Sequence, residues 1–200
     1  HLMQPEQQDL LNRATAFYCT GFLLTVSPDT IRHVGEHAVA HGGKRLYFNI
    51  SAPFIAQFFT DRLRMAIEYA DVVFGNEGEL GAVAQAFNLS HGGEVHKLII
   101  ELDEAIPHKS GRERLIVITQ GANETVFYSK SLGVHRCPVP VMLPSEIVDT
   151  NGAGDAFVGG FISQHISGKS VKECVDAGHA VAQVIIKQSG VVFPSEQPKW

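Results

Sequence analysis

Four short apolar runs alternate along the chain with segments that have helical periodicity. The runs are AFYCTGFLL (Ala16–Leu24), RLYFNI (Arg45–Ile50), DVVFGN (Asp71–Asn76) and RLIVITQG (Arg114–Gly121). Their length and their β-branched and aromatic residues predict strands. Mostly apolar strands that alternate with helices are typical of a parallel sheet buried between helices on both faces. We therefore expect an α/β fold with a mostly parallel central sheet.

The segments between these strands carry helix signals. Ser27 is the expected N-cap, and Pro28 the first residue, of a helix that ends at Gly42–Gly43. Further helices are expected over residues 53–70 (as one helix or two short ones), 77–88 and 92–106.

Beyond the fourth strand the pattern changes. ETVFYSK (Glu124–Lys130) and GVHRCPVPVML (Gly133–Leu143) are short and bounded by turns, which indicates an antiparallel pair at the edge of the sheet. Two helices follow, at about residues 154–166 and 171–187. Because no repeat, low-complexity tract or linker interrupts the chain, we expect one α/β domain over residues 1–200.

The composition argues against several classes of protein. A formal net charge of −5 without a basic stripe argues against nucleic-acid binding, and no run of eighteen apolar residues suggests a membrane span. The ten histidines form no HExxH or paired Cys/His spacing, which argues against zinc. Cys19, Cys137 and Cys174 are too widely spaced for a disulfide framework or a CxxC site. We expect a reducing compartment, the cytoplasm or the nucleus.

The N-terminal stretch HLMQPEQQDLLNRATAFYCTGFLL has no initiator methionine, no charged n-region and no cleavage-site pattern. It is therefore not expected to be a signal peptide. His1 opens what reads as the interior of a helix, so we expect the chain to begin partway through a longer protein.

Polar residues follow the predicted strands at their carboxyl ends, where open α/β sheets bind ligands. The candidates are Asn49 and Ser51, Asn76 and Glu79, Thr119–Gly121, and Asp149–Asp155. Taken alone, NISAPF (Asn49–Phe54) indicates a strand-to-helix turn with Phe54 in the core, and TQG (Thr119–Gly121) indicates a turn.

The stretch VDTNGAGDAFVGGF (Val148–Phe161) joins a glycine-rich turn to an apolar helix. It matches neither the GxGxxG motif nor a P-loop. Phe157 stands where GxGxxG needs glycine or alanine, and Gly160 stands where a P-loop needs lysine. The amides of Gly152, Ala153 and Gly154 could still approach an anion at a helix N-terminus. The helix's buried face is expected to comprise Phe157, Val158, Phe161, Ile162 and Ile166.

Asp155 places a carboxylate at this anion site. One interpretation is a flexible entry turn that Asp155 caps. The other is a general base, because a phosphotransferase must deprotonate an alcohol while it stabilises the transferred group. The carboxylate favours the second interpretation, since it would otherwise repel a phosphate.

Two further patterns have both a structural and a functional interpretation. In GNEGE (Gly75–Glu79), Asn76 and Glu79 have the spacing of a capping box, and they could also organise Mg²⁺ through its waters. His179 lies in a helix of small residues, AGHAVA, where a histidine usually packs, although a flat ring could lie against such a helix.

DTNGAGDAFVGGF resembles the signature of the ribokinase/PfkB-type carbohydrate and nucleoside kinases. The companion stretches GFLLTVSP, FNISAPFIAQFF, VVFGNEGE, ITQG and DAGHAVAQVIIKQSGVVFP resemble the adenosine kinase branch of that family. The resemblance runs from about Phe17 to Pro194. It implies a ribokinase-like three-layer sandwich and ATP-dependent phosphorylation of the adenosine 5′-hydroxyl, which yields AMP and ADP in purine salvage.

The resemblance also implies roles for individual residues. Asp155 matches the catalytic base, and Gly152, Ala153 and Gly154 match the anion hole around the γ-phosphate. Asn76 and Glu79 match the NxxE motif that orders Mg²⁺ through water. Thr119 and Gly121 match the ATP site, Asn151 and His179 match positions near the nucleotide base, Asn49 and Ser51 lie on the substrate side, and a monovalent cation such as K⁺ is implied near Asp149.

Family members also carry an N-terminal section with a first strand, a glycine pair, an aspartate for the ribose hydroxyls and a small lid, and these 200 residues show none of it. The resemblance therefore implies a partner segment, either another chain or another part of this protein. Two alternatives stay open: another sugar or nucleoside kinase of the family, and a nucleotide-binding fragment without turnover.

Overall fold

The computed structural model describes residues 4–90 and 93–192, which form two compact units. The first unit holds the residues up to Gln120 together with Val126–Arg136, and the second holds Gly121–Thr125 together with the residues from Cys137 onwards. That the chain acts as one domain stays a prediction. No helix in the described ranges is long and apolar enough to cross a membrane.

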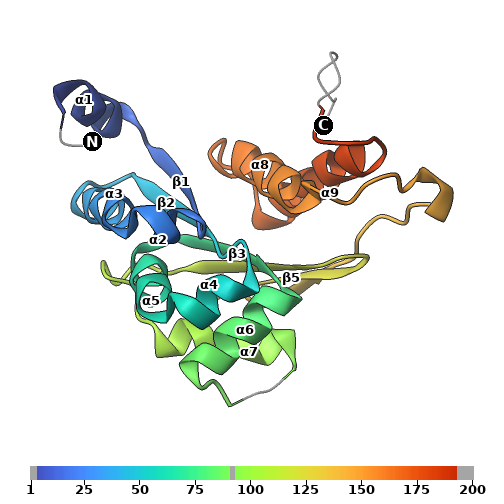
Figure 1. Cartoon of the computed structure of the whole chain (residues 1–200), viewed down its shortest axis with the longest axis horizontal. Helices are drawn as coiled ribbons and strands as arrows, with labels where there is room; N and C mark the ends of the chain where they lie inside the picture. The colour runs from blue at the N-terminus through green and yellow to red at the C-terminus, as the bar shows by residue number, and fades with distance from the viewer. Residues whose placement is uncertain (1–3, 91–92, 193–200) are drawn as a thin grey trace. The chain divides into compact units, whose positions relative to one another are not determined.

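One sheet contains the six strands of the described residues, in the order β1-β2-β3-β4-β5-β6 (Figure 1). The strands are β1 (Ala16–Thr20), β2 (Arg45–Asn49), β3 (Val72–Asn76), β4 (Leu115–Gln120), β5 (Asn123–Ser129) and β6 (Gly133–Cys137). Strands β1 to β4 pair in parallel. Only Gly121 and Ala122 join β4 to β5, and a two-residue connection is possible only between antiparallel strands, so β5 runs antiparallel to β4. The mostly parallel sheet is confirmed.

Two strands end several residues earlier than the sequence predicts, whereas the ends of the others differ from the prediction by at most one residue. The first stops at Thr20 rather than Leu24, because Gly21 turns the chain against the carbonyl of Ile50. The last stops at Cys137 rather than Leu143. Pro138 follows it and has no amide to donate to a strand ladder.

The helices of the first unit follow the predicted order except for α2, whose Leu23 and Leu24 were predicted to belong to the first strand. They are α1 (Pro5–Arg13), α2 (Leu23–Val26), α3 (Pro28–Ala40), α4 (Pro53–Phe58), α5 (Thr60–Tyr69), α6 (Glu77–Phe87) and α7 (Val95–Ala105). Residues 53–70 form two helices because the backbone at Phe59 leaves the helical region. Ser27 precedes α3 as predicted, but its hydroxyl bonds to the Thr30 hydroxyl at 2.8 Å instead of capping an amide.

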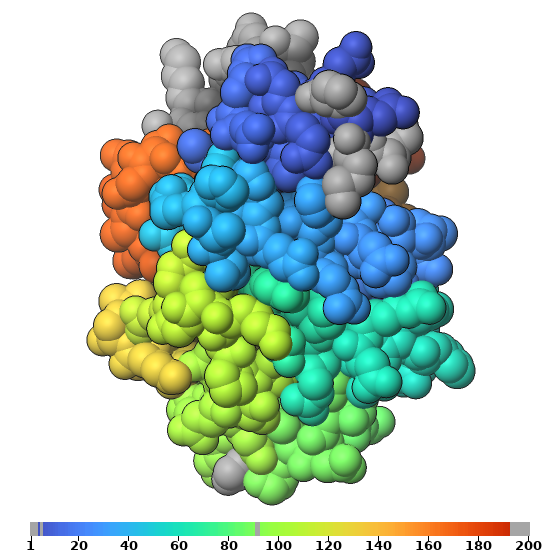
Figure 2. Space-filling model, turned by 90° about the vertical axis from the view of Figure 1, so that its left-hand side faces the viewer, coloured from blue at the N-terminus to red at the C-terminus, as the bar shows by residue number. Residues whose placement is uncertain are grey.

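The hydrophobic core of the first unit lies between the sheet and these helices. Figure 1 shows α4, α5, α6 and α7 on one side of the sheet, and the space-filling view shows α1 and α3 in blue above the teal and green helices (Figure 2). Alternate residues of the strands reach this core, including Phe48 on β2, Val73 on β3 and Ile116 on β4, all fully buried. Each such side chain contributes about 1.5–3 kcal/mol relative to exposure.

The second unit is built on the close packing of α8 (Ala153–His165) against α9 (Val171–Ile186). A Cβ added at Gly160 would lie 2.7 Å from the Ala177 carbonyl oxygen, and one at Gly178 would lie 2.6 Å from the Phe157 ring. Only glycine permits this approach.

The predicted buried face of α8 is largely confirmed. Phe157, Val158 and Phe161 are buried. Ile166 is 60% exposed, so its assignment to this face was wrong. It occupies the C-cap, beyond the last helical residue, and the helical periodicity does not extend to it.

Candidate active site

In the first unit, the carboxyl ends of the parallel strands bring candidate residues into register. Thr20 of β1 pairs with Asn49 of β2, and Asn76 of β3 pairs with Thr119 of β4. The Thr119 hydroxyl is 3.4 Å from the Gly75 carbonyl oxygen that it bonds. The predicted polar residues of β2, β3 and β4 thus lie together at the carboxyl ends of these strands.

Asn76 and Glu79 form the predicted capping box at the start of α6. Asn76 Oδ1 accepts a hydrogen bond from the Glu79 amide at 2.9 Å, and Glu79 Oε2 accepts from the Asn76 amide at 3.1 Å. Asn76 Nδ2 also donates to Glu79 Oε1 at 2.9 Å. Glu79 is only 6% exposed, and a Cβ at Gly75 would lie 3.2 Å from its carboxylate. Glycine at position 75 therefore leaves room for the carboxylate to fold back over the strand end.

This box fits a metal ion only through water. Both carboxylate oxygens of Glu79 already accept hydrogen bonds from Asn76. In residues 4–90 and 93–192, no three His, Cys, Asp or Glu side chains gather closely enough to hold an ion directly. Mg²⁺ keeps several of its waters in proteins, so contact between the ion and this carboxylate would run through water.

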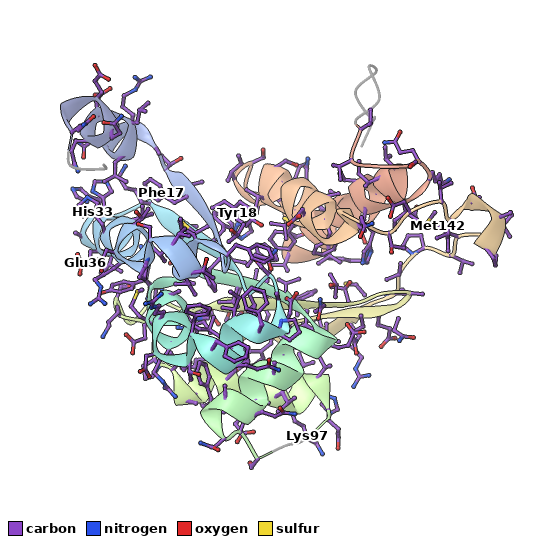
Figure 3. The ribbon with its side chains drawn as sticks, viewed as in Figure 1. Phe17, Tyr18, His33, Glu36, Lys97 and Met142 are labelled. Carbon is purple, nitrogen blue, oxygen red and sulfur yellow. The ribbon has the colours of Figure 1, made fainter. Side chains whose placement is uncertain are left out.

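Asn49 and Ser51 are both used to build the turn after β2. Asn49 is 8% exposed; its Oδ1 accepts from the Ser51 amide at 3.1 Å, and its Nδ2 donates to the Tyr18 hydroxyl at 3.3 Å. Figure 3 shows Tyr18 and its neighbour Phe17 on β1. The Ser51 hydroxyl donates to the Asn49 carbonyl at 3.1 Å. The polar groups of both side chains therefore already form hydrogen bonds within the protein.

Two aromatic residues beside this turn are exposed. Phe22 is 52% exposed and Phe54 is 38% exposed, and their ring centroids are 6.1 Å apart with an interplanar angle of 42°. The expectation that Phe54 lies in the core was wrong, because the first turn of α4 directs it away from the buried Ile55 and Ala56. Phe22 was not among the predicted site residues. The signal that could have identified it is an aromatic residue directly after Gly21, the glycine that follows β1.

In the second unit, Gly152 is the N-cap of α8, with φ of 77°. A Cβ there would lie 2.4 Å from Val191 Cγ2, so the position requires glycine both for conformation and for space. The first intrahelical bond runs from the Ala156 amide to the Gly152 carbonyl at 2.9 Å. The amides of Gly154 and Asp155 therefore have no acceptor within the helix.

Asp155 lies exposed in the first turn of α8. The interpretation that Asp155 caps this helix is wrong, since the N-cap is Gly152 and Asp155 is already the third helical residue. A free carboxylate next to free amides at a helix N-terminus can accept a proton while the amides stabilise an anion.

Asp149 fastens the loop before α8 to the end of α9. Its Oδ1 accepts from the Asn151 amide at 2.9 Å and its Oδ2 accepts from the Gly190 amide at 3.3 Å. The Asp149 amide itself donates to the Ile186 carbonyl at 3.2 Å. Asn151 is exposed and Asp149 is half-buried.

His179 is a buried residue of the second unit, only 4% exposed. Its Nε2 is 2.8 Å from the Thr125 hydroxyl, and its ring centroid is 5.5 Å from that of Phe157. Burial lowers the pKa of His179 below its ordinary value, and the opposing effect of Asp176 is smaller. The imidazole is therefore neutral at physiological pH. Gly121, in the turn between β4 and β5, is exposed with φ of 59°.

The chain resembles known kinases in sequence and in structure. Adenosine kinase 1 of Arabidopsis thaliana is 43% identical over 200 residues, which cover 98% of this chain and 56% of that protein. Adenosine kinase from Schistosoma mansoni in complex with adenosine and AMP superposes with a TM-score of 0.87 at 34% identity, over 98% of this chain and 57% of that one. Anopheles gambiae adenosine kinase in complex with P1,P4-di(adenosine-5) tetraphosphate gives 0.87 at 36% identity, over 95% and 55%.

The chain thus spans about half the length of the relatives it matches, 56% of the Arabidopsis protein. The structural matches bear out the ribokinase-like fold that the sequence predicts. The family profile of the pfkB family carbohydrate kinases matches residues 1–198, and this chain belongs to that family.

Proposed function

We propose that this chain provides the phosphate-transfer residues of an adenosine kinase, which uses ATP to phosphorylate the adenosine 5′-hydroxyl and releases AMP and ADP. The observation that carries the proposal is the start of α8, where an exposed carboxylate accompanies amides that have no acceptor within the helix. The adenosine kinases that match the chain support the choice of nucleoside.

Asp155 acts as the general base in this proposal. Its carboxylate takes the proton of the 5′-hydroxyl while a bond forms between that oxygen and the γ-phosphorus. The bond from the γ-phosphorus to the bridging oxygen breaks at the same time, and ADP leaves. The amides of Gly152, Ala153 and Gly154 would stabilise the developing negative charge. Gly154 is the clearest donor because it lacks an intrahelical acceptor, whereas the Ala153 amide already donates to the Thr150 carbonyl at 3.2 Å.

Asn76 and Glu79 would hold Mg²⁺ through its waters, and the ion would neutralise charge on the phosphates. A monovalent cation such as K⁺ beside Asp149 is part of the same proposal. The Asp149 carboxylate accepts hydrogen bonds from two backbone amides, so it would bind a cation only through its remaining lone pairs.

Phe22 and Phe54 would bind the purine of the nucleoside. Their exposed rings, 6.1 Å apart, present apolar faces on which a flat heterocycle can stack. Asn49 and Ser51 would serve this surface indirectly, because their polar groups are engaged in the turn that precedes Phe54.

Thr119, Gly121 and Asn151 would contact ATP, since each is at least partly accessible. His179 would support the nucleotide site as a buried residue of α9.

All three cysteines are free and buried, which supports a reducing compartment such as the cytosol.

The test is a comparison of acceptors with the full-length protein. Adenosine with ATP and Mg²⁺ should yield AMP and ADP in equal amounts. Ribose, fructose and other nucleosides, assayed in parallel by ADP release, should give much lower kcat/KM. Preferential phosphorylation of one of those acceptors would contradict the assignment to adenosine.

A further inference from the structure

The turn after β2 holds a serine in the left-handed backbone region. Ser51 has φ of 73°, and in the part of the chain that the structure describes, Asn88 is the other non-glycine residue with positive φ. Asn88 is the C-cap of α6, a place where asparagine commonly adopts this conformation. Serine rarely does so, and such strain persists only where surrounding contacts impose it.

Several hydrogen bonds impose the conformation of Ser51. Its amide donates to Asn49 Oδ1 at 3.1 Å, and its hydroxyl donates to the Asn49 carbonyl at 3.1 Å. The same hydroxyl accepts from the Gly21 amide at 3.1 Å. On either side, the Ile50 amide donates to the Phe74 carbonyl at 2.9 Å and the Ala52 amide donates to the Ile50 carbonyl at 3.0 Å.

Gly21 is the other half of this connection. Its amide is shared between the Ser51 hydroxyl and the Asn49 carbonyl, the latter at 2.7 Å. A Cβ at position 21 would lie 2.1 Å from the Ile50 carbonyl oxygen, so any other residue would force the two strand ends apart. The ends of β1 and β2 are therefore tied together by Gly21, Asn49 and Ser51.

This connection sits at the base of the exposed aromatic pair. Phe22 directly follows Gly21, and Phe54 follows Ser51 by three residues, in the first turn of α4. Because both aromatic residues leave the same tied strand ends, a change in the tie changes the separation and tilt of their rings. The 6.1 Å spacing and 42° tilt belong to the tied state.

We propose that Ser51 is a positioning residue that sets the geometry of the Phe22–Phe54 pair through its hydroxyl bond to the Gly21 amide, and so sets the affinity for the base of the nucleoside without contacting it. This inference rests on the proposed function, which makes the ring pair the base-binding surface. It reassigns Ser51 from the substrate to the scaffold that shapes the substrate's site.

The experiment compares Ser51→Ala and Ser51→Gly with the wild type in the full-length protein. Both variants lose the hydroxyl, and glycine also removes the strain, so Ser51→Gly remains informative where the alanine variant folds poorly. We expect the KM for adenosine to rise about tenfold in both, corresponding to about 1.4 kcal/mol of lost binding. The KM for ATP and kcat should stay within about twofold, because the α8 residues are untouched.

A second readout does not depend on catalysis. In protein labelled selectively at phenylalanine, ring-to-ring nuclear Overhauser effects report the Phe22–Phe54 separation, and they should weaken in both variants. Asn88→Ala is the matched control, since it places strain at the other left-handed non-glycine position and should change neither the ring contacts nor the KM for adenosine.

The inference would be overturned by ring contacts that persist in both variants, or by a KM for adenosine that stays at the wild-type value while the contacts weaken. An equal rise in the KM for both substrates would also overturn it, since it indicates general disruption. A wild-type protein that phosphorylates no adenosine would instead refute the proposed function, and that result is visible before any variant is made.

Discussion

The Glu79 carboxylate accepts hydrogen bonds from both the amide and the side-chain nitrogen of Asn76, at 3.1 and 2.9 Å. The same contacts that cap α6 also hold the carboxylate in a fixed orientation at the strand end. The capping role of this pair and its proposed role in ordering Mg²⁺ therefore depend on the same contacts, and a variant must be chosen that separates them.

Glu79→Gln makes this separation because it keeps the size of the side chain and removes its charge. We expect the Mg²⁺ concentration for half-maximal activity to rise about tenfold, while the free energy of unfolding falls by about 1 kcal/mol or less. Activity titrated with Mg²⁺ and urea unfolding measure the two effects.

The control is Glu173→Gln, in the exposed capping box that Ser170 and Glu173 form at the start of α9. It should show the small stability loss without any change in Mg²⁺ dependence. An unchanged Mg²⁺ titration in Glu79→Gln would assign that residue to helix capping alone.

Asp155→Asn should remove the base and leave the anion site in place. General bases contribute about 10²–10⁴-fold, so we expect kcat to fall by that factor while the Kd for ATP, measured by calorimetry, stays nearly constant. Asp176→Asn breaks the exposed pair with Lys172 and lets the pKa of His179 fall further, which leaves that ring neutral, so this variant should retain full activity. Loss of ATP binding together with turnover would argue against the base assignment.

Arg114 is fully buried and should carry much of the stability of the first unit. Its guanidinium donates to Asp103 at 3.0 Å and to the carbonyls of Ile67 and Ile106, both at 2.8 Å. Arg114→Met removes the buried cation and leaves the Asp103 carboxylate with only its 3.7 Å ion pair to Lys130, and we expect a loss of about 3–5 kcal/mol in urea unfolding. Arg13→Met, which removes an exposed pair with Asp9, should cost less than about 0.5 kcal/mol. A loss below about 1 kcal/mol at Arg114 would refute this role.

The local patterns of the sequence were sufficient for much of this structure. Apolar runs separated by helical segments predict a parallel sheet because both signals are contained within a few residues. The Asn76–Glu79 box and the glycine start of α8 are likewise set by neighbours in the chain.

Features that depend on distant partners could not be predicted in this way. The acceptors of Arg114 lie 8 to 47 residues away in sequence, so nothing near Arg114 marks it as buried. Phe54 is exposed because the first turn of α4 directs it away from the core, and α4 follows a turn that is held by a hydrogen bond between Gly21 and Ser51, 30 residues apart. The sequence around Phe54 alone reads as an ordinary helix start.

Acid should destabilise the protein through its buried histidines. His108 lies in the loop before β4; its Nδ1 accepts from the Ser110 amide at 3.1 Å, and its Nε2 is 3.6 Å from Asp71. Burial lowers the pKa of His108, with Arg114 and Arg112 acting in the same direction and Asp71 opposing them. Since the unfolded chain then binds more protons, this contribution is present above about pH 6.5 and is lost as the pH falls towards the folded-state pKa.

The check is urea unfolding of His108→Gln between pH 5.5 and 7.5. The variant should lose stability less steeply than the wild type as the pH falls. His135→Gln, in an exposed ring that stacks on Phe127, serves as the control. Identical slopes in wild type and His108→Gln would exclude His108 from the acid response, leaving it to the half-buried His37 and the buried His179, whose pKa values desolvation also lowers.

The thiols of Cys19 and Cys174 should be inert in the folded protein. Burial raises the pKa of each to about 11. At pH 8 only about one thiol in a thousand is then a thiolate, the reactive form. We expect a disulfide reagent such as dithionitrobenzoate to label neither residue within an hour at pH 8, and to label all three cysteines at once in 6 M guanidinium as a control for accessibility. Cys19→Ser and Cys174→Ser identify which thiol reacts. Rapid labelling of either one in native protein would show that its helix or strand opens far more often than its full burial implies.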